Sequence, residues 1–253
     1  MHHKRIMRSI ILLAFLLLIG CADNNNANKA VPLPAMELHE QVTLGQYKNK
    51  DLQWLVIAKE KGKALLLCKY FIDEMPFDEK NDNAYWKNCS LRYWLNKDFY
   101  ENAFSDEEKQ SILLSTLENP SVKFAEVYTD TILAVGDEPY FYYYPDENYD
   151  SLANSLEEED SMELQKTKAE PSTQDHVFIL SLQEAGLYAM DIDSPLLSYK
   201  SKYDYSYSWL RTHANPTVYD TGAMVSGYQD FYPWGFYTDE PMPVRPATWV
   251  ACK

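Results

Sequence analysis

The stretch from Tyr85 to Thr116 constrains the fold most strongly, because it combines dense apolar and aromatic residues with two signals for a helix start. Its apolar residues begin with Leu91 and recur at the spacing that lines one helix face. Ser90 stands where an N-cap belongs, and Ser105 precedes Glu108 at capping-box spacing. The stretch predicts two consecutive helices, the second reaching about 112–114. The residues expected to face the core are Trp94, Leu95, Phe99, Phe104, Ile112 and Leu113.

The composition predicts a globular chain with an excess of aromatic residues. A length of 253 residues suits one large domain or two small ones. The sequence contains 20 Tyr and 6 Trp, more than an ordinary core requires. Tyrosine-rich surfaces often serve as contact surfaces, although tyrosines also fill half-buried strand positions. Both interpretations fit this chain.

The charge balance argues against nucleic acid as a partner. The formal net charge is −15, and it becomes −18 once a signal segment carrying the three cations Lys4, Arg5 and Arg8 is removed. A protein of that charge repels phosphate backbones and anionic lipids.

The N-terminus has the organisation of a bacterial export signal. The three cations precede an apolar run, residues 10–19, that is too short to span a bilayer. The run ends in Leu18-Ile19-Gly20-Cys21, which resembles the lipobox of bacterial lipoproteins. The alternative is an ordinary secretory signal, residues 1–20, with an incidental cysteine. The resemblance implies that cleavage leaves Cys21 at the new N-terminus, where it carries acyl chains such as palmitate.

Lipid attachment at Cys21 implies a location outside the cytoplasm, on the cell membrane or the outer membrane. Several acyl chains make a durable anchor. Residues 21–36 are rich in Asn, Ala and Pro and predict a flexible tether. Ala22 replaces the Asp that commonly retains such proteins at an inner membrane, which favours the outer membrane in a cell that has two.

Three further cysteines, Cys68, Cys89 and Cys252, lie in the mature chain. A Cys68–Cys89 disulfide is slightly favoured outside the cytoplasm, and three buried free thiols are nearly as compatible with the sequence. Neither a C-x-x-C motif nor a Cys/His cluster is present, so we expect no metal site.

The remaining patterns predict a small, mostly antiparallel sheet within a single domain of residues 37–253. Runs at 52–59 and 63–71 flank Glu60-Lys61-Gly62, which predicts a hairpin. Further strands are expected at 127–135, 176–181, 207–212, 218–225 (as two short strands) and 244–250, and a short helix at 182–190.

Residues 137–174 are predicted to form an inserted loop or a disordered segment. They are rich in Tyr, Pro and acidic residues and include the acidic block 157–160. The block could bind calcium, but no EF-hand spacing accompanies it, so a solvated acidic surface is the preferred interpretation.

Several motifs together resemble a known family. They are W-K-N-C-S-L-R-Y-W-L-N-K-D-F at 86–99, W-L-R at 209–211 and V-R-P-A at 244–247. In this order they resemble a large, uncharacterised bacterial family of extracytoplasmic domains of unknown function, over about 42–251. The chain departs from the family pattern at Ser208, Thr212 and Pro243. The ending is also similar to C-type-lectin-like folds, including the formylglycine-generating-enzyme type. The expected fold is therefore α+β, with a small twisted antiparallel sheet, two or three helices and long loops, and the resemblance implies a C-type-lectin-like arrangement.

Two sets of residues are candidates for ligand contact. Arg92, Arg211 and Arg245 stand beside aromatic residues in an acidic chain and could converge on an anionic ligand. The alternative, that each pairs locally in a structural role, is favoured. The aromatic segment 226–241 is broken by Gly and Pro and predicts an exposed contact loop. A loop packed over its own core is equally compatible. Its candidate contact residues are Tyr228, Phe231, Tyr232, Trp234, Phe236 and Tyr237.

These observations favour a binding module over an enzyme. Nucleophile-elbow, zinc-protease and nucleotide-binding motifs are absent from the sequence, and no cofactor is expected. The first hypothesis is a lipid-anchored module that recognises a glycan or an envelope protein. The alternatives are a structural envelope lipoprotein and a formylglycine-generating-like enzyme. That enzyme requires paired cysteines near the C-terminus, where only Cys252 occurs.

Overall fold

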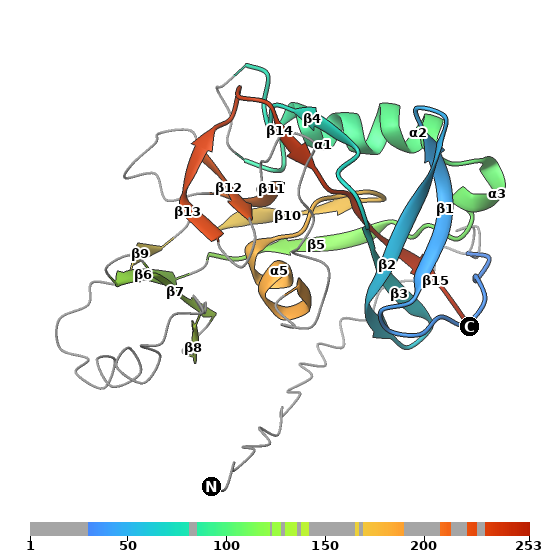
Figure 1. Ribbon diagram of the computed structural model, residues 1–253, viewed down its shortest axis with the longest axis horizontal. Coiled ribbons are helices and arrows are strands. Elements are labelled where there is room, and N and C mark those ends of the chain that lie inside the picture. Colours follow the sequence, from blue (N-terminus) through green and yellow to red (C-terminus); the bar gives the residue numbers. More distant parts are fainter. Residues whose placement is uncertain are drawn as a thin grey trace, which may run out of the picture.

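The computed structural model describes most of the domain that follows the tether (Figure 1). The described residues are 30–80, 85–121, 123–127, 130–135, 138–141, 165–166, 169–189, 208–213, 222–226 and 231–253. The fold is α+β and mostly β, with antiparallel sheets and few helices, as expected. Cys21 and the signal segment lie outside the described residues.

A four-stranded antiparallel sheet in the order β1-β2-β3-β15 forms the centre of the domain. The predicted hairpin is confirmed, since β2 and β3 are joined by a turn at Lys61-Gly62. The last strand, β15, pairs with β3 and is entirely buried. The strands are β1 (Gln41–Tyr47), β2 (Lys50–Glu60), β3 (Lys63–Cys68) and β15 (Ala247–Ala251).

The first predicted helix is confirmed as a run of three helical segments. It begins after Cys89 rather than after Ser90, because the Cys89 sulfur accepts a hydrogen bond from the Arg92 amide. A π-helical turn occupies its middle. Its apolar face is buried, apart from the half-buried Trp94. The segments are α1 (Ser90–Trp94), η1 (Leu95–Phe99) and α2 (Tyr100–Ala103).

The second predicted helix begins as expected but is much shorter. The Ser105–Glu108 capping box is present and opens α3 (Asp106–Lys109). The expected extension to 112–114 is wrong, because the chain leaves the helix to pair with β15. Ile112 forms a bridge with Val250, and the Leu113 amide donates to the Trp249 carbonyl at 2.8 Å.

The other sheets lie to one side of this sheet, to its left in Figure 1. Two strands pair in each of β5–β10 and β4–β14, and three strands form β11-β12-β13. Residues 123–135, expected to contain one strand, form two strands of a further sheet in the order β8-β7-β6-β9. Their bounds are β4 (Asp73–Met75), β5 (Ser115–Asn119), β6 (Lys123–Val127), β7 (Asp130–Val135), β8 (Glu138–Phe141), β9 (Gln165–Lys166), β10 (Glu170–Asp175), β11 (Ser208–His213), β12 (Gly222–Ser226), β13 (Phe231–Tyr237) and β14 (Met242–Val244).

Three expectations about the second half of the chain require correction. The end of the expected insertion, 170–175, is strand β10, paired with β5, and β8 and β9 also fall within 137–174. Residues 176–181 are buried but form only the isolated bridge Phe178–Ala247 instead of a strand. The expected loop 226–241 contains strand β13, which pairs with β12. Pairing with another segment, distant for β10 and 176–181 and nearby for β13, decides the local conformation.

The short helix α5 (Leu182–Ala189) is confirmed together with its capping box. The Ser181 amide donates to Glu184 Oε2 at 2.9 Å, and the Glu184 amide donates to Ser181 Oγ at 3.1 Å. This box fixes the position of the Glu184 carboxylate.

Three fully buried tryptophans anchor the core, and each has a partner for its indole N–H. Trp54 donates to the Leu44 carbonyl at 2.7 Å, and Trp209 donates to the Met75 carbonyl at 2.8 Å. Trp86 donates to the Asp175 carboxylate at 3.0 Å. Each bond joins segments that are separate in the sequence, so the core has one specific arrangement.

Candidate functional site

The aromatic residues expected to form a contact loop lie on or next to strand β13. Tyr228 lies outside the described residues. The backbones of Phe231, Tyr232 and Trp234 belong to β13, and their side chains are likewise outside the description. Phe236 packs partly buried against the core, whereas the Tyr237 side chain is 52% exposed.

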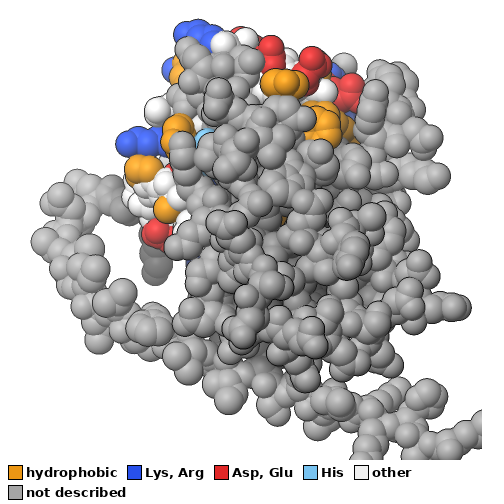
Figure 2. All heavy atoms as spheres, turned by 90° about the vertical axis from the view of Figure 1, so that its left-hand side faces the viewer, with side chains coloured by type: hydrophobic (Ala, Val, Ile, Leu, Met, Phe, Trp, Pro, Cys, Tyr) orange, Lys and Arg blue, Asp and Glu red, His pale blue; other side chains and the backbone are white. Residues whose placement is uncertain are grey.

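The side of the molecule that carries β13 faces the viewer in Figure 2. The described side chains that are visible there gather along its upper edge. Acidic, basic and hydrophobic groups are interspersed among them. Among the described side chains of the segment 226–241, Tyr237 is the aromatic one that lies at the surface, by its exposed fraction.

The Arg211 side chain is buried and bound to partners within the protein. Its side chain is 1% exposed and forms a two-pronged ion pair with Glu184, with Nη2 lying 2.8 Å from Oε1. Its Nε donates to Asn119 Oδ1 at 2.9 Å, and Nη1 donates to the Ile179 carbonyl at 2.8 Å. These bonds connect β11 to β5, to α5 and to the segment before α5.

The other two arginines also have local partners. Arg92 Nε donates to the fully buried Asp175 at 2.7 Å. Arg245 is buried, and its Nε donates to the Cys68 carbonyl at 2.8 Å. The three guanidinium groups bind different partners in different parts of the domain. The geometry therefore agrees with the structural alternative.

The cysteines Cys68, Cys89 and Cys252 are free and buried, so the favoured Cys68–Cys89 disulfide is not formed. Cys89 instead acts as the N-cap of α1, and its thiol also donates to the Trp86 carbonyl. Burial raises the pKa of Cys68 to about 11 and raises that of Cys89 further. Both thiols are therefore protonated and unreactive near neutral pH.

Two buried carboxylates lie around the start of α1. Asp78 accepts a hydrogen bond from the Ser90 amide at 3.1 Å, and Glu170 accepts one from the Lys87 amide at 3.4 Å. One oxygen of each carboxylate is buried without a hydrogen-bond partner. Burial raises the pKa of Glu170 to about 7, although the Trp86 and Lys87 amides and Arg211 act in the opposite direction.

Replacing Glu170 with Gln is expected to change how stability depends on pH. Native Glu170 retains its proton up to about pH 7, whereas the unfolded chain releases it near 4.5, the ordinary value. The native protein should therefore lose stability as the pH rises through this window. Urea unfolding at pH 4.5, 6 and 8 should show that the free energy of unfolding falls less steeply with pH in Glu170→Gln than in the native protein. Glu118→Gln, at an exposed residue of β5, controls for the lost charge. Identical slopes in the native protein and Glu170→Gln would contradict the prediction.

Asn96 joins the helical run to the segment that follows β10. An Asn that follows the apolar residues Trp94 and Leu95 predicts a C-terminal cap of the first helix. This prediction is wrong, because Asn96 lies inside the π-helical turn η1. Its amide nitrogen donates to the Val177 carbonyl at 2.8 Å. Its Oδ1 accepts from the His176 amide at 2.8 Å and from the Val177 amide at 3.2 Å. These bonds fix the backbone that carries the His176 side chain.

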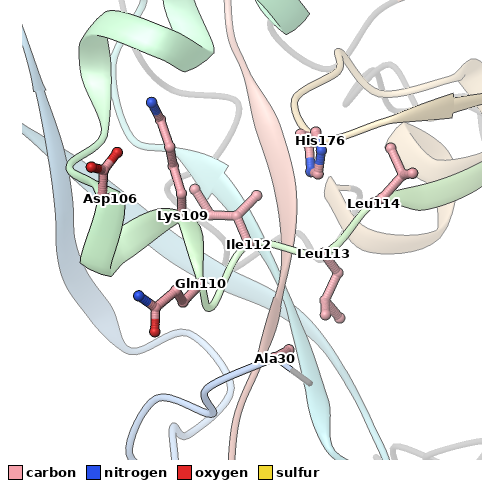
Figure 3. Close-up of a pocket in the computed structure, with 8 residues that line it drawn as sticks. All are labelled: Ala30, Asp106, Lys109, Gln110, Ile112, Leu113, Leu114 and His176. Carbon is pink, nitrogen blue, oxygen red and sulfur yellow. The ribbon is translucent and has the colours of Figure 1, made fainter. Parts of the chain in front are cut away.

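His176 lines a pocket of about 620 Å³, here named the His176 pocket (Figure 3). Ile112 and Leu113 lie between His176 at one end and Ala30 at the other. The other lining residues come from α3 and the segment after it. Most of them are polar and lie beside the apolar side chains of Ile112 and Leu113. The full lining is Ala30, Asp106, Lys109, Gln110, Ile112, Leu113, Leu114 and His176.

The His176 ring is held in place on one wall of this pocket. It stacks on Tyr100 with ring centroids 4.4 Å apart and planes 4° from parallel. The ring also forms a hydrogen bond with the Leu113 backbone, and its Nδ1 is buried without a hydrogen-bond partner. Burial lowers the pKa of His176, against the influence of Asp175, Glu101 and the Leu113 bond. The ring is therefore an uncharged wall of the pocket at neutral pH.

The pocket lining carries one acidic and one basic side chain, Asp106 and Lys109. Asp106 belongs to the acidic first turn of α3. The lining cation Lys109 is paired with Glu101 at 2.7 Å. Lys109 also donates to the Glu101 carbonyl at 3.1 Å. Its positive charge is therefore already matched within the protein.

Sequence reasoning did not find this pocket. The capping box did locate α3, one of its walls. His176 is an isolated histidine in the sequence, without the spacing of a metal site, and its neighbours in the pocket come from a distant part of the chain. The signal that could have pointed to the pocket was the exposed apolar character of the segment after α3, where Leu114 is 56% exposed.

Among the described His, Cys, Asp and Glu residues, no group of three is arranged to hold a metal ion. In the part of the chain that the structure describes, no helix is long and apolar enough to cross a membrane.

The described residues form an α+β domain that contains a β1-β2-β3-β15 sheet and a pocket flanked by α3. A family model for a domain of unknown function (DUF6273) matches residues 61–132. The match includes β3, the α1–α2 helical run and α3, and therefore the W-L-N motif. The W-L-R and V-R-P-A motifs lie outside it. No curated protein and no solved structure matches the chain significantly.

Proposed function

We propose that this chain is a lipid-anchored, extracytoplasmic recognition protein that binds its ligand in the His176 pocket. Acylated Cys21 holds it on the cell membrane or outer membrane, as the lipobox-like sequence at 18–21 suggests. The ligand is an envelope protein or a glycan. A C-type-lectin-like fold is part of this proposal, suggested by the similarity of the W-L-R and V-R-P-A ending to such folds.

The observation that carries the proposal is the composition of the pocket. A concave site with an apolar floor and a few polar groups at its edge is typical of a binding site. Its apolar side consists of Ile112, Leu113 and Leu114, and a polar side of similar extent consists of Asp106, Lys109, Gln110 and His176. The pocket lining contains no Ser, Cys or Thr that His176 could activate, so this arrangement suits binding better than nucleophilic catalysis.

The aliphatic floor favours a protein ligand over a glycan at this pocket. Sugars stack on aromatic rings, whereas the faces of Ile and Leu suit the apolar side chain of a partner. A glycan remains the second candidate ligand, at a different place. Tyr237, exposed at the end of β13, is the observation that favours it.

The anchor is tested by labelling cells with radioactive palmitate. The native protein should incorporate label and fractionate with membranes, and Cys21→Ser should do neither. An unlabelled native protein would refute lipid attachment.

Recognition is tested with the full-length protein in nanodiscs, applied to a glycan array and to purified envelope proteins. Loss of binding in Leu114→Ser, with binding retained in Tyr237→Ala, would assign the ligand to the His176 pocket. The reverse result would assign it to the β13 surface. Failure of a folded sample to bind either set would refute the recognition function.

A further inference from the structure

The His176 pocket lies beside the point at which the tether enters the domain. Ala30 lines the pocket, and the Val31 amide donates to the Gln110 carbonyl at 2.9 Å. In the proposed lipoprotein, only nine peptide units separate Ala30 from the acylated Cys21. A fully extended chain of that length spans at most about 32 Å. The anchor therefore keeps the pocket within about that distance of the lipid headgroups.

The charge of the pocket indicates what can occupy it there. Asp106 and Glu107 stand in the first turn of α3, and Lys109 is matched by Glu101. The mature chain as a whole is strongly acidic. This surface repels anionic headgroups and attracts a basic partner. A protein segment therefore suits the pocket better than the lipid itself.

The apolar part of the pocket indicates what the partner segment must carry. Leu114, which lines the pocket, is 56% exposed. A large aliphatic side chain left exposed in a pocket gains free energy when an apolar side chain covers it.

We propose that the His176 pocket binds a basic protein segment with a central apolar side chain, presented at the membrane surface by a membrane-embedded protein. This proposal rests on the proposed lipid anchor and deepens the proposed function by naming the class of partner. Apolar contact with Ile112, Leu113 and Leu114 supplies affinity, and Asp106 supplies charge complementarity.

The test uses the full-length acylated protein in phosphatidylcholine vesicles and a synthetic peptide probe. The probe carries one Leu flanked by two Lys on each side, and it is compared with its Leu→Ala and Lys→Glu versions. We expect the Lys/Leu probe to bind about tenfold more tightly than either version. Leu114→Ser should remove this preference. Leu187→Ser, at an exposed leucine of similar accessibility on α5, should keep it.

Membrane presentation is tested by lengthening the tether. A 40-residue Gly/Ser insertion after Asn26 should weaken binding of a vesicle-anchored probe several-fold, because the effective concentration falls. Binding of the free probe should not change. Equal effects on both probes would overturn the membrane-surface part of the proposal.

The outcomes separate this inference from the proposed function. An acylated protein that binds the Leu and Ala probes equally, or loses binding equally in Leu114→Ser and Leu187→Ser, overturns the inference alone. If phosphatidylglycerol vesicles alone prevent the peptide probe from binding, the pocket binds lipid, and this result would also overturn the inference. A chain that is not acylated overturns the proposed anchor, while the free probe still reports on the pocket.

Discussion

Replacing Arg211 with alanine is expected to lower the free energy of unfolding by about 3–5 kcal/mol, the usual cost of breaking a buried ion pair. The change leaves Glu184 without its cation and Asn119 Oδ1 and the Ile179 carbonyl without the donors they now have. It also removes the guanidinium from above the Phe178 ring, 5.4 Å from its centroid. Lysine cannot replace arginine, because a single ammonium cannot span these partners. Urea unfolding monitored by tryptophan fluorescence measures the loss.

A matched pair of controls makes this prediction specific. Lys59→Ala breaks the Lys59–Glu37 pair, in which both residues are exposed, and should cost at most about 1 kcal/mol. Arg211→Met with Glu184→Gln removes both charges and should cost less than the two single changes together. A loss below about 1 kcal/mol in Arg211→Ala, or strict additivity in the double variant, would contradict the structural role of Arg211.

The features that could be predicted from the sequence are those whose conformation depends on interactions between residues close together in the chain. The capping boxes at Ser105 and Ser181 are such features, because one side chain and one nearby amide satisfy each other. The β2–β3 hairpin is another, since its turn glycine, Gly62, has φ +78°. The apolar face of the 90–103 helical run also followed directly from residue spacing.

The features missed were those decided by pairing partners that the local sequence does not identify, most of them far along the chain. Segment 112–114 leaves its helix because β15 offers backbone partners. Strand β13 forms despite Pro233 and Gly235 because β12 lies alongside it, with a shift in register between them. Asn96 was assigned to a helix end because nothing near it revealed that its side chain binds the 176–177 backbone. Local propensity cannot anticipate such pairing.

The candidate site was harder to predict than the fold for the same reason. The aromatic residues of 226–241 and the arginines attracted attention by their composition, but the arginines are used inside the structure. The His176 pocket brings together Ala30, the end of α3 and the residue after β10. No spacing in the sequence relates these three segments.

Gly45→Ala is expected to destabilise the domain by about 3 kcal/mol, because the position excludes a Cβ for two independent reasons. Gly45 has φ +76°, a conformation that costs L-residues roughly 1–2 kcal/mol. A Cβ there would lie 2.6 Å from Phe104 Cδ1 and 2.7 Å from the Ala103 carbonyl oxygen. Overpacking of this kind typically costs about 1–3 kcal/mol. The irregular register of β1 with β2 at this point brings the Gly45 amide to Glu108 Oε1 at 2.8 Å, so movement away from Phe104 also strains the α3 capping box.

Gly62→Ala separates the two costs. Gly62 has nearly the same backbone angle, φ +78°, but a Cβ there would meet nothing within 4 Å. It should therefore lose only the conformational part, about 1 kcal/mol. The difference between the two variants in urea unfolding then measures the close approach of β1 to the start of α3. Equal losses would show that Phe104 and the Ala103 carbonyl move aside freely. Such freedom would mean that the α2–α3 junction, next to the helix that lines the His176 pocket, is not rigidly packed against the central sheet.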